Sequence, residues 1–291
     1  MYWLSKRKYI FLLLVPVLIV YIVYMCAPIA VAIGYSFTKY TGIGKAVYNG
    51  LDNYIRLFKD EVFYVSLKNT LIVFAGSFVL LVIGGFAVAL LLNVKLRFNA
   101  LSKSLVFAPA IIAPIIVGII WVFIFDPKVG LVNSVLIAMG LSDHTRLWIG
   151  GKTLTPFCVT LIYFWQQLGY LATIYIAGLK LIPGELFEAV EIDGANGWQR
   201  LRFITIPMMK NSISTVSILV ITGTFKIFEV VQQLTNGGPN HMSETLVTYG
   251  YAKTFSNGEY GYGMAISTIT FLLSLLITFI YSILSKEKEA M

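Results

Sequence analysis

Six apolar stretches divide the sequence, and each is long enough to cross a lipid bilayer as one helix. They run at about residues 9–33, 69–92, 104–125, 155–179, 211–234 and 262–285. A helix needs about 20 apolar residues to cross the hydrocarbon core. Backbone groups in lipid must also bond within the protein, so only helices and closed barrels can span it. We therefore expect an all-α polytopic membrane protein with six transmembrane helices, in which residues 1–291 form one domain.

The composition agrees with this class. The chain is 58% hydrophobic and 12% charged, and the charged share is about half that of an ordinary soluble domain. The net charge of +8 does not indicate nucleic-acid binding, because in a membrane protein the distribution of Lys and Arg carries the information.

The first apolar stretch could be a cleavable signal peptide. It follows Lys6, Arg7 and Lys8, and Ala30-Val31-Ala32 resembles a cleavage site. The apolar core of a signal peptide is about 7–15 residues long, and this stretch is much longer. We therefore expect a retained first span.

The distribution of basic residues predicts the orientation. With the N-terminus inside, the inner segments hold 12 of the 22 Lys and Arg residues at about twice the density of the outer loops. The first outer loop is itself basic, so the difference is moderate. This arrangement places both termini in the cytosol.

One polar interruption, residues 183–207, lies between the fourth and fifth stretches and predicts two short helices with a corner. Pro183 is tolerated in a first helical turn, and Gly194 can adopt the left-handed conformation that ends a helix. Asn196 followed by Gln199 is typical of a capping box that begins a second helix. A surface helix pair of this kind needs a partner on which to dock.

This segment also resembles a known family. The runs Glu188-Ala189-Val190, Asp193-Gly194-Ala195 and Ile204-Thr205-Ile206-Pro207 resemble the EAA loop in membrane subunits of bacterial ABC importers. Val190 and Ile206 replace an Ala and a Leu of that pattern. The resemblance implies that this loop fits a cleft in a cytosolic ATPase subunit. The implied coupling residues are Glu185, Glu188, Ala189, Val190, Asp193, Gly194, Ala195, Arg200 and Pro207.

The resemblance extends over almost the whole chain. Gly50-Leu51-Asp52-Asn53-Tyr54, the segment from Trp121 to Asn133, and Leu234 to Pro239 followed by Glu244-Thr245 are similar to the first membrane subunit of maltose- and glycerol-phosphate-type importers. It implies a carbohydrate substrate, a bacterial cytoplasmic membrane, a second permease subunit, two ATPase subunits that bind ATP and magnesium, and an extracytoplasmic solute-binding protein. The residues implied to face that binding protein are Thr235, Gly237, Gly238 and Pro239.

The fifth stretch is unusually polar for a span. Thr215, Thr222, Lys226, Glu229 and Gln233 share one helical face. A charge at mid-span costs at least about 2.5 kcal/mol, so Lys226 and Glu229 either pair with each other or line an aqueous cavity. Aromatic and amide side chains on the fourth stretch suit a sugar, although its tyrosines could equally be interfacial or packing residues. The candidate pathway residues are Tyr163, Trp165, Gln166, Tyr170, Thr222, Lys226 and Glu229.

No nucleotide or metal site is expected in this chain. Gly150-Gly151-Lys152-Thr153 resembles the end of a phosphate loop, but Arg146 stands where that motif needs its first Gly. Cys26 and Cys158 both fall in apolar stretches, where we expect small buried side chains without a disulfide. We therefore expect a transport subunit without cofactors that is not an enzyme. Two rivals remain: a secondary transporter with ion coupling at Lys226 and Glu229, and a membrane scaffold that transports nothing.

Overall fold

The computed structural model describes residues 7–94, 99–151 and 153–287. Lys6 and Lys152, which entered the predictions on the first span and the phosphate loop, lie outside them. The chain divides into two compact units. The first unit contains the residues up to Asp60 together with Tyr249–Thr270, and the second contains Glu61–Thr248 and the residues from Phe271 onward.

The first unit begins with a long apolar helix. Its parts are α1 (Arg7–Tyr21), a π-helical segment (Ile22–Cys26) and α2 (Ala27–Ser36). A hairpin of β1 (Thr38–Lys39) and β2 (Val47–Tyr48), then α3 (Asp52–Leu57), follow. A π-helical segment (Ala252–Ser256) and the start of α16 (Tyr260–Glu287) complete the unit.

Most side chains of this first helix are exposed, and the side chain of Cys26 is exposed as well. The prediction that Cys26 is buried was therefore wrong, whereas Cys158 is buried as expected. Lipid tails are as apolar as leucine, so a membrane helix can leave such side chains unpacked by its own chain.

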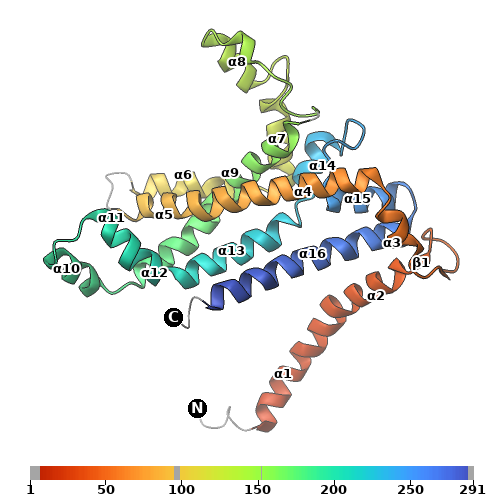
Figure 1. Ribbon diagram of the computed structural model, residues 1–291, viewed down its shortest axis with the longest axis horizontal. Helices are drawn as coiled ribbons and strands as arrows, with labels where there is room; N and C mark the ends of the chain where they lie inside the picture. The colour runs from red at the N-terminus through yellow and green to blue at the C-terminus, as the bar shows by residue number, and fades with distance from the viewer. Residues whose placement is uncertain (1–6, 95–98, 152, 288–291) are drawn as a thin grey trace. The chain divides into compact units, whose positions relative to one another are not determined.

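The second unit is a bundle around α9 (Thr155–Lys180), which contacts helices on several sides (Figure 1). These are α4 (Glu61–Val79), α5 (Gly85–Asn93), α6 (Asn99–Ile111), α7 (Pro114–Ile124) and α13 (Lys210–Thr224). A π-helical segment (Leu80–Gly84) joins α4 to α5. Two apolar cores lie along α9, one around Ile162 and one around Tyr175, both fully buried.

Shorter elements complete this unit. They are α8 (Leu131–Ala138), a 3₁₀ turn (Ser142–His144), α10 (Gly184–Ile192), α11 (Gly197–Arg200), a π-helical segment (Leu201–Thr205), α12 (Ile206–Met208), α14 (Glu229–Thr235) and α15 (Leu246–Tyr251), whose last residues belong to the first unit.

Within the part of the chain that the structure describes, four helices are long and apolar enough to cross a membrane: Phe11–Ser36, Glu61–Asn93, Thr155–Lys180 and Tyr260–Ser285. Two bent pairs raise the number to six if each pair is one span. The first pair, Ala100–Ile111 with Pro114–Ile124, bends by 102°. Pro114 explains this break, because a proline disfavours helical geometry in the preceding residue, and Ala113 is extended.

The predicted fifth span, residues 211–234, is not one helix. The second bent pair joins Gly197–Met208 to Lys210–Thr224 at 68°, and α13 ends at Thr224 while α14 begins at Glu229. Non-helical backbone in a membrane protein is tolerated where it lines a cavity, and Lys226 in this break lines one.

Candidate functional site

A cavity of about 280 Å³ lies within the second unit, between α9, α13 and α14. Tyr163, Gln166 and Tyr170 of α9 line it, together with Lys226 in the break and Glu229 at the start of α14. Spacings of three and four residues place the α9 side chains on one helical face. The structure thus brings together five of the seven candidate pathway residues.

The break between α6 and α7 helps to shape this cavity. Gln166 is 3% exposed, and its Nε2 atom donates a hydrogen bond of 3.1 Å to the carbonyl oxygen of Ile112. That carbonyl lies at the break, where helical hydrogen bonding is interrupted before Pro114. Gln166 therefore satisfies an otherwise free backbone group and also faces the cavity.

Lys226 and Glu229 are both exposed and line the cavity together. Both residues lie in the part of the chain that the structure describes, and they do not form an ion pair with each other. A self-neutralising pair, one of the two alternatives from the sequence, is therefore absent here. Two separate charges beside amides and phenols make the cavity hydrophilic on one side.

Trp165 and Thr222 lie elsewhere. The indole of Trp165 packs edge-on against Trp121, with 5.6 Å between ring centroids. The hydroxyl of Thr222 donates to the carbonyl oxygen of Ile218 at 2.8 Å. Their proposed pathway role has no support from the cavity lining. The sequence did not single out Pro114 and Leu219 as lining residues, since nothing in it shows that α7 and α13 border the same cavity.

The polar segment 183–207 contains two short helices with well-defined ends. Gly194 has φ +74° and follows the last turn of α10. The amide of Ala195 donates to the carbonyl oxygen of Val190, and the amide of Gly194 donates to that of Glu191, both at 3.1 Å. These two bonds form a Schellman motif, which uses the left-handed conformation that glycine adopts at least cost. The positive φ expected at Gly194 is present.

The second helix of this segment begins with the expected capping box. The side chain of Asn196 accepts a hydrogen bond from the amide of Gln199 at 2.9 Å, and the Gln199 side chain accepts one from the amide of Asn196 at 2.8 Å. The guanidinium of Arg200 lies 5.7 Å from the ring centroid of Phe187 and links the two helices. Pro183 precedes α10 instead of lying in its first turn.

Four large apolar side chains of this segment are exposed: Ile192 (87%), Trp198 (65%), Phe203 (66%) and Ile206 (40%). The carboxylate of Glu185 lies in the first turn of α10, where the helix dipole favours a negative charge. This corner therefore exposes apolar side chains together with a carboxylate in the first turn of α10.

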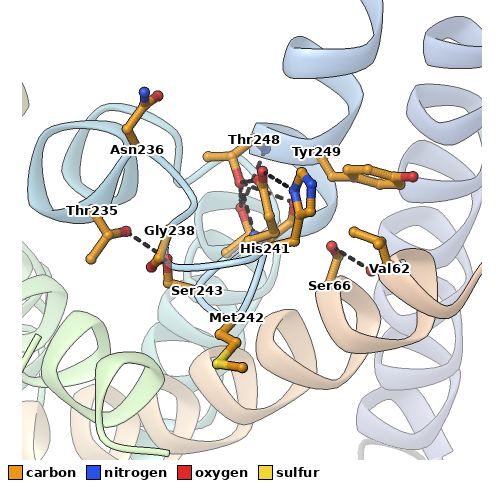
Figure 2. Close-up of polar contacts among 12 residues, drawn as sticks. Val62, Ser66, Thr235, Asn236, Gly238, His241, Met242, Ser243, Thr248 and Tyr249 are labelled. Carbon is orange, nitrogen blue, oxygen red and sulfur yellow. Dashed lines mark hydrogen bonds and ion pairs between the residues drawn. The ribbon is translucent and has the colours of Figure 1, made fainter. Parts of the chain in front are cut away.

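The loop after α14 has an unusual backbone. Asn236, Gly237, Asn240 and His241 all have positive φ, and the Gly238–Pro239 peptide bond is cis. The Ser243 hydroxyl donates to the carbonyl oxygen of Gly238 at 2.7 Å and lies 2.6 Å from the Thr235 hydroxyl (Figure 2).

Glu244 is the centre of this loop, although it is only 4% exposed. Its Oε2 atom accepts a 2.6 Å hydrogen bond from the Thr248 hydroxyl, and its Oε1 atom lies 3.3 Å from Nδ1 of His241. A Cβ atom on Gly237 would lie 2.3 Å from Oε1 of Glu244. Asn69 of α4 donates to the carbonyl oxygens of Met242 and Glu244 at 2.8 and 2.9 Å. The buried carboxylate of Glu244 and the side-chain amide of Asn69 on α4 thus both stabilise the loop.

Within the described residues, no group of three His, Cys, Asp or Glu side chains could hold a metal ion. The three polar features described above are a charged cavity, a corner between two capped helices and a loop that packs around a buried carboxylate. Such an arrangement suits movement of a solute coupled to another protein.

Comparison with known proteins decides the family. A family model described as "Binding-protein-dependent transport system inner membrane component" matches residues 81–289. The chain belongs to this family. It is therefore a multi-pass membrane protein and the permease subunit of an ABC transporter, in which ATP hydrolysis resides in a separate subunit.

Relatives and solved structures agree with this membership. The probable ABC transporter permease protein YurN of Bacillus subtilis (strain 168) is 33% identical over 92% of each chain. The arabinooligosaccharides transport system permease protein AraP of the same organism is 32% identical over 95% of this chain and 88% of its own. A chain in the crystal structure of a bacterial alginate ABC transporter, in complex with a periplasmic protein bound to an alginate pentasaccharide, has a TM-score of 0.84. At 21% identity, with 98% of this chain and 96% of that chain covered, it shows a shared fold.

Proposed function

We propose that this permease subunit forms half of the pathway through which a sugar or oligosaccharide enters the cell. The carrying observation is the cavity in which Tyr163, Gln166, Tyr170, Lys226 and Glu229 meet. Phenol and amide groups hydrogen-bond to hydroxyls, and aromatic faces pack on the C–H surfaces of a sugar ring. The substrates named for AraP and for the alginate transporter are also carbohydrates.

Residues 183–207 would couple this pathway to ATP. The exposed Ile192 and Trp198 would enter a cleft of the ATPase subunit, and the bonds around Gly194 would keep the corner rigid enough to transmit force. Closure of two ATPase subunits around ATP and magnesium would then change the relative orientation of the membrane helices. This change would open the cavity to the outside and admit the substrate. Hydrolysis would restore the inward-facing state.

The segment Thr235 to Pro239 would face an extracytoplasmic solute-binding protein. The buried carboxylate of Glu244 fixes its shape before any partner arrives, and a preformed loop loses less conformational freedom on binding. A second permease subunit would complete the pathway, and both termini would lie in the cytosol.

Transport measured in proteoliposomes tests the function. The complex of this chain with its second permease and ATPase subunits is reconstituted with the binding protein and a panel of neutral and acidic oligosaccharides. At least one oligosaccharide should accumulate when ATP is enclosed on the ATPase side. Uptake that persists without ATP but stops with an ionophore would favour a secondary transporter, and no uptake of any carbohydrate would contradict the substrate class.

Cysteine labelling tests the orientation. In a Cys26→Ser, Cys158→Ser background, Asn236→Cys and Ala100→Cys place single thiols on exposed residues. A membrane-impermeant maleimide added to intact cells or spheroplasts should label Asn236→Cys, and should label Ala100→Cys only after lysis. The opposite pattern would show that the proposed orientation is inverted.

A further inference from the structure

A second cavity of about 400 Å³ lies between α5, α6 and α9 in the second unit and is separate from the proposed sugar pathway. Its apolar lining includes Leu92, Phe107 and Ile176. Two lysines, Lys103 of α6 and Lys180 of α9, line it as well. The cavity is therefore amphiphilic, with an apolar wall and two cationic groups.

Neither lysine has a counter-ion in the part of the chain that the structure describes. Lys180 lies in the last turn of α9, where the helix dipole favours a cation. Lys103 lies in the second turn of α6 and has no such stabilisation. A half-buried lysine with no carboxylate partner indicates that an anion comes from outside the chain.

Hydroxyl groups lie beside the two cations. Ser104 and Thr173 also line the cavity, and the Thr173 hydroxyl donates to the carbonyl oxygen of Gly169 at 2.9 Å. Along α9 the lining runs from Gly169 to Lys180, which is about 16 Å at 1.5 Å per residue. That length accommodates an acyl chain as well as a headgroup.

We propose that this cavity binds an acidic phospholipid, with its phosphate on Lys103 and Lys180 and an acyl chain against Phe107 and Ile176. Basic pockets between membrane helices bind acidic headgroups through this combination of charge and apolar surface. A soluble anion would use the lysines and leave the apolar wall uncovered. The inference does not depend on the carbohydrate assignment.

The test measures lipid binding to the intact transporter complex in detergent by native mass spectrometry. Wild type and the double variant Lys103→Gln/Lys180→Gln are titrated with phosphatidylglycerol, and with phosphatidylcholine of the same acyl chains. Each lysine near an acidic headgroup changes affinity about fivefold. The double variant should therefore bind phosphatidylglycerol about 30-fold more weakly, with phosphatidylcholine binding unchanged.

Lys68→Gln is the matched control, because Lys68 also lines a mainly apolar cavity, of about 410 Å³, without an ion pair among the described residues. This variant should retain wild-type affinity. Thr173→Trp fills the proposed cavity while keeping both charges, so it should also weaken binding, and it carries the test if the double variant misfolds. Lys103→Arg/Lys180→Arg should restore binding.

Three outcomes would overturn the proposal. The first is equal phosphatidylglycerol affinity in wild type, the double variant and Thr173→Trp. The second is an equal loss in Lys68→Gln, which would reflect net charge alone. The third is full competition by millimolar inorganic phosphate, which would show a soluble-anion site.

Discussion

Lys226 and Glu229 line the same cavity but form no ion pair with each other. Removing one partner of a buried pair costs about 3–5 kcal/mol. In a water-accessible cavity the same change should cost little, because the remaining charge stays hydrated. We therefore expect Glu229→Gln to lower the melting temperature by no more than a few degrees and to reduce substrate uptake severalfold.

Both quantities are measured on the same purified complex. Asp143→Asn also removes one carboxylate, from an exposed residue that does not line the cavity, and is the control. Strong destabilisation of Glu229→Gln, with normal uptake per folded molecule, would show that Glu229 has a structural partner and no place in the pathway.

The second prediction concerns the backbone conformation of Gly194. With φ +74°, a side chain there is strained by about 1–2 kcal/mol, although nothing lies within 4 Å of an added Cβ atom. Gly194→Val should therefore distort the corner without a steric clash and leave the apolar helices inserted. We expect at least a tenfold loss of ATPase subunit recovered by co-purification.

Gly197→Val is the control for this variant, because Gly197 also has open space around it but does not have positive φ. It should retain the ATPase subunit at near wild-type yield. Equal recovery from both variants would contradict the role of this corner in assembly.

Local chemistry explains why this corner could be predicted from sequence. The Schellman bonds of Gly194 and the capping box of Asn196 and Gln199 join residues within five positions of one another, so their spacing alone specifies them. The apolar stretches likewise follow from length and hydropathy. Family membership confirmed the function class that the motifs indicated.

The remaining features depend on contacts that sequence spacing does not show. The helix break at residues 225–228 contains no proline or glycine. The prediction assumed one continuous helix over 211–234 and therefore did not include this break. The support of Glu244 by Thr248 was not expected, and Asn69 lies more than 170 positions from the carbonyl groups to which it donates. Trp165 was grouped with the pathway because it is near Gln166 in sequence, yet its ring packs on Trp121.

The third prediction concerns the close approach of Gly237 to the carboxylate of Glu244. Gly237 has φ +78°, and an added Cβ atom would lie 2.3 Å from the buried carboxylate. Gly237→Ala should force Glu244 out of its hydrogen bond with Thr248 and change the shape of the loop. We expect at least a tenfold weaker affinity for the substrate-loaded binding protein, measured by surface plasmon resonance on the reconstituted complex.

Gly140→Ala separates backbone strain from the steric clash. Gly140 has a similar φ of +76° but nothing within 4 Å of an added Cβ atom. If both variants weaken the binding protein to the same extent, the contact with Glu244 has no specific role.

The last prediction concerns pH and the first unit. Arg56 forms an ion pair and hydrogen bond with Glu259, and Lys253 lies 3.6 Å from the same carboxylate. The hydrogen bond from Arg56 holds the pKa of Glu259 below its ordinary value of 4.5. Because the folded-state pKa is depressed, this stabilisation is complete above the ordinary value and is lost as pH falls through the folded value.

Both side chains are partly exposed, so the contribution should be about 0.2–1 kcal/mol. Arg56→Gln should therefore lower the melting temperature at pH 7 by a few degrees at most, and the difference from wild type should shrink as the pH falls from 5 to 3. Thermal unfolding of the purified complex across that range measures the effect.

Lys45→Gln removes an exposed positive charge outside this cluster, and its difference from wild type should not shrink as the pH falls. A difference between Arg56→Gln and wild type that stays constant down to pH 3 would mean that Arg56 stabilises the unit by packing on Tyr262, whose ring centroid lies 4.1 Å from the guanidinium, and not through the charge of Glu259.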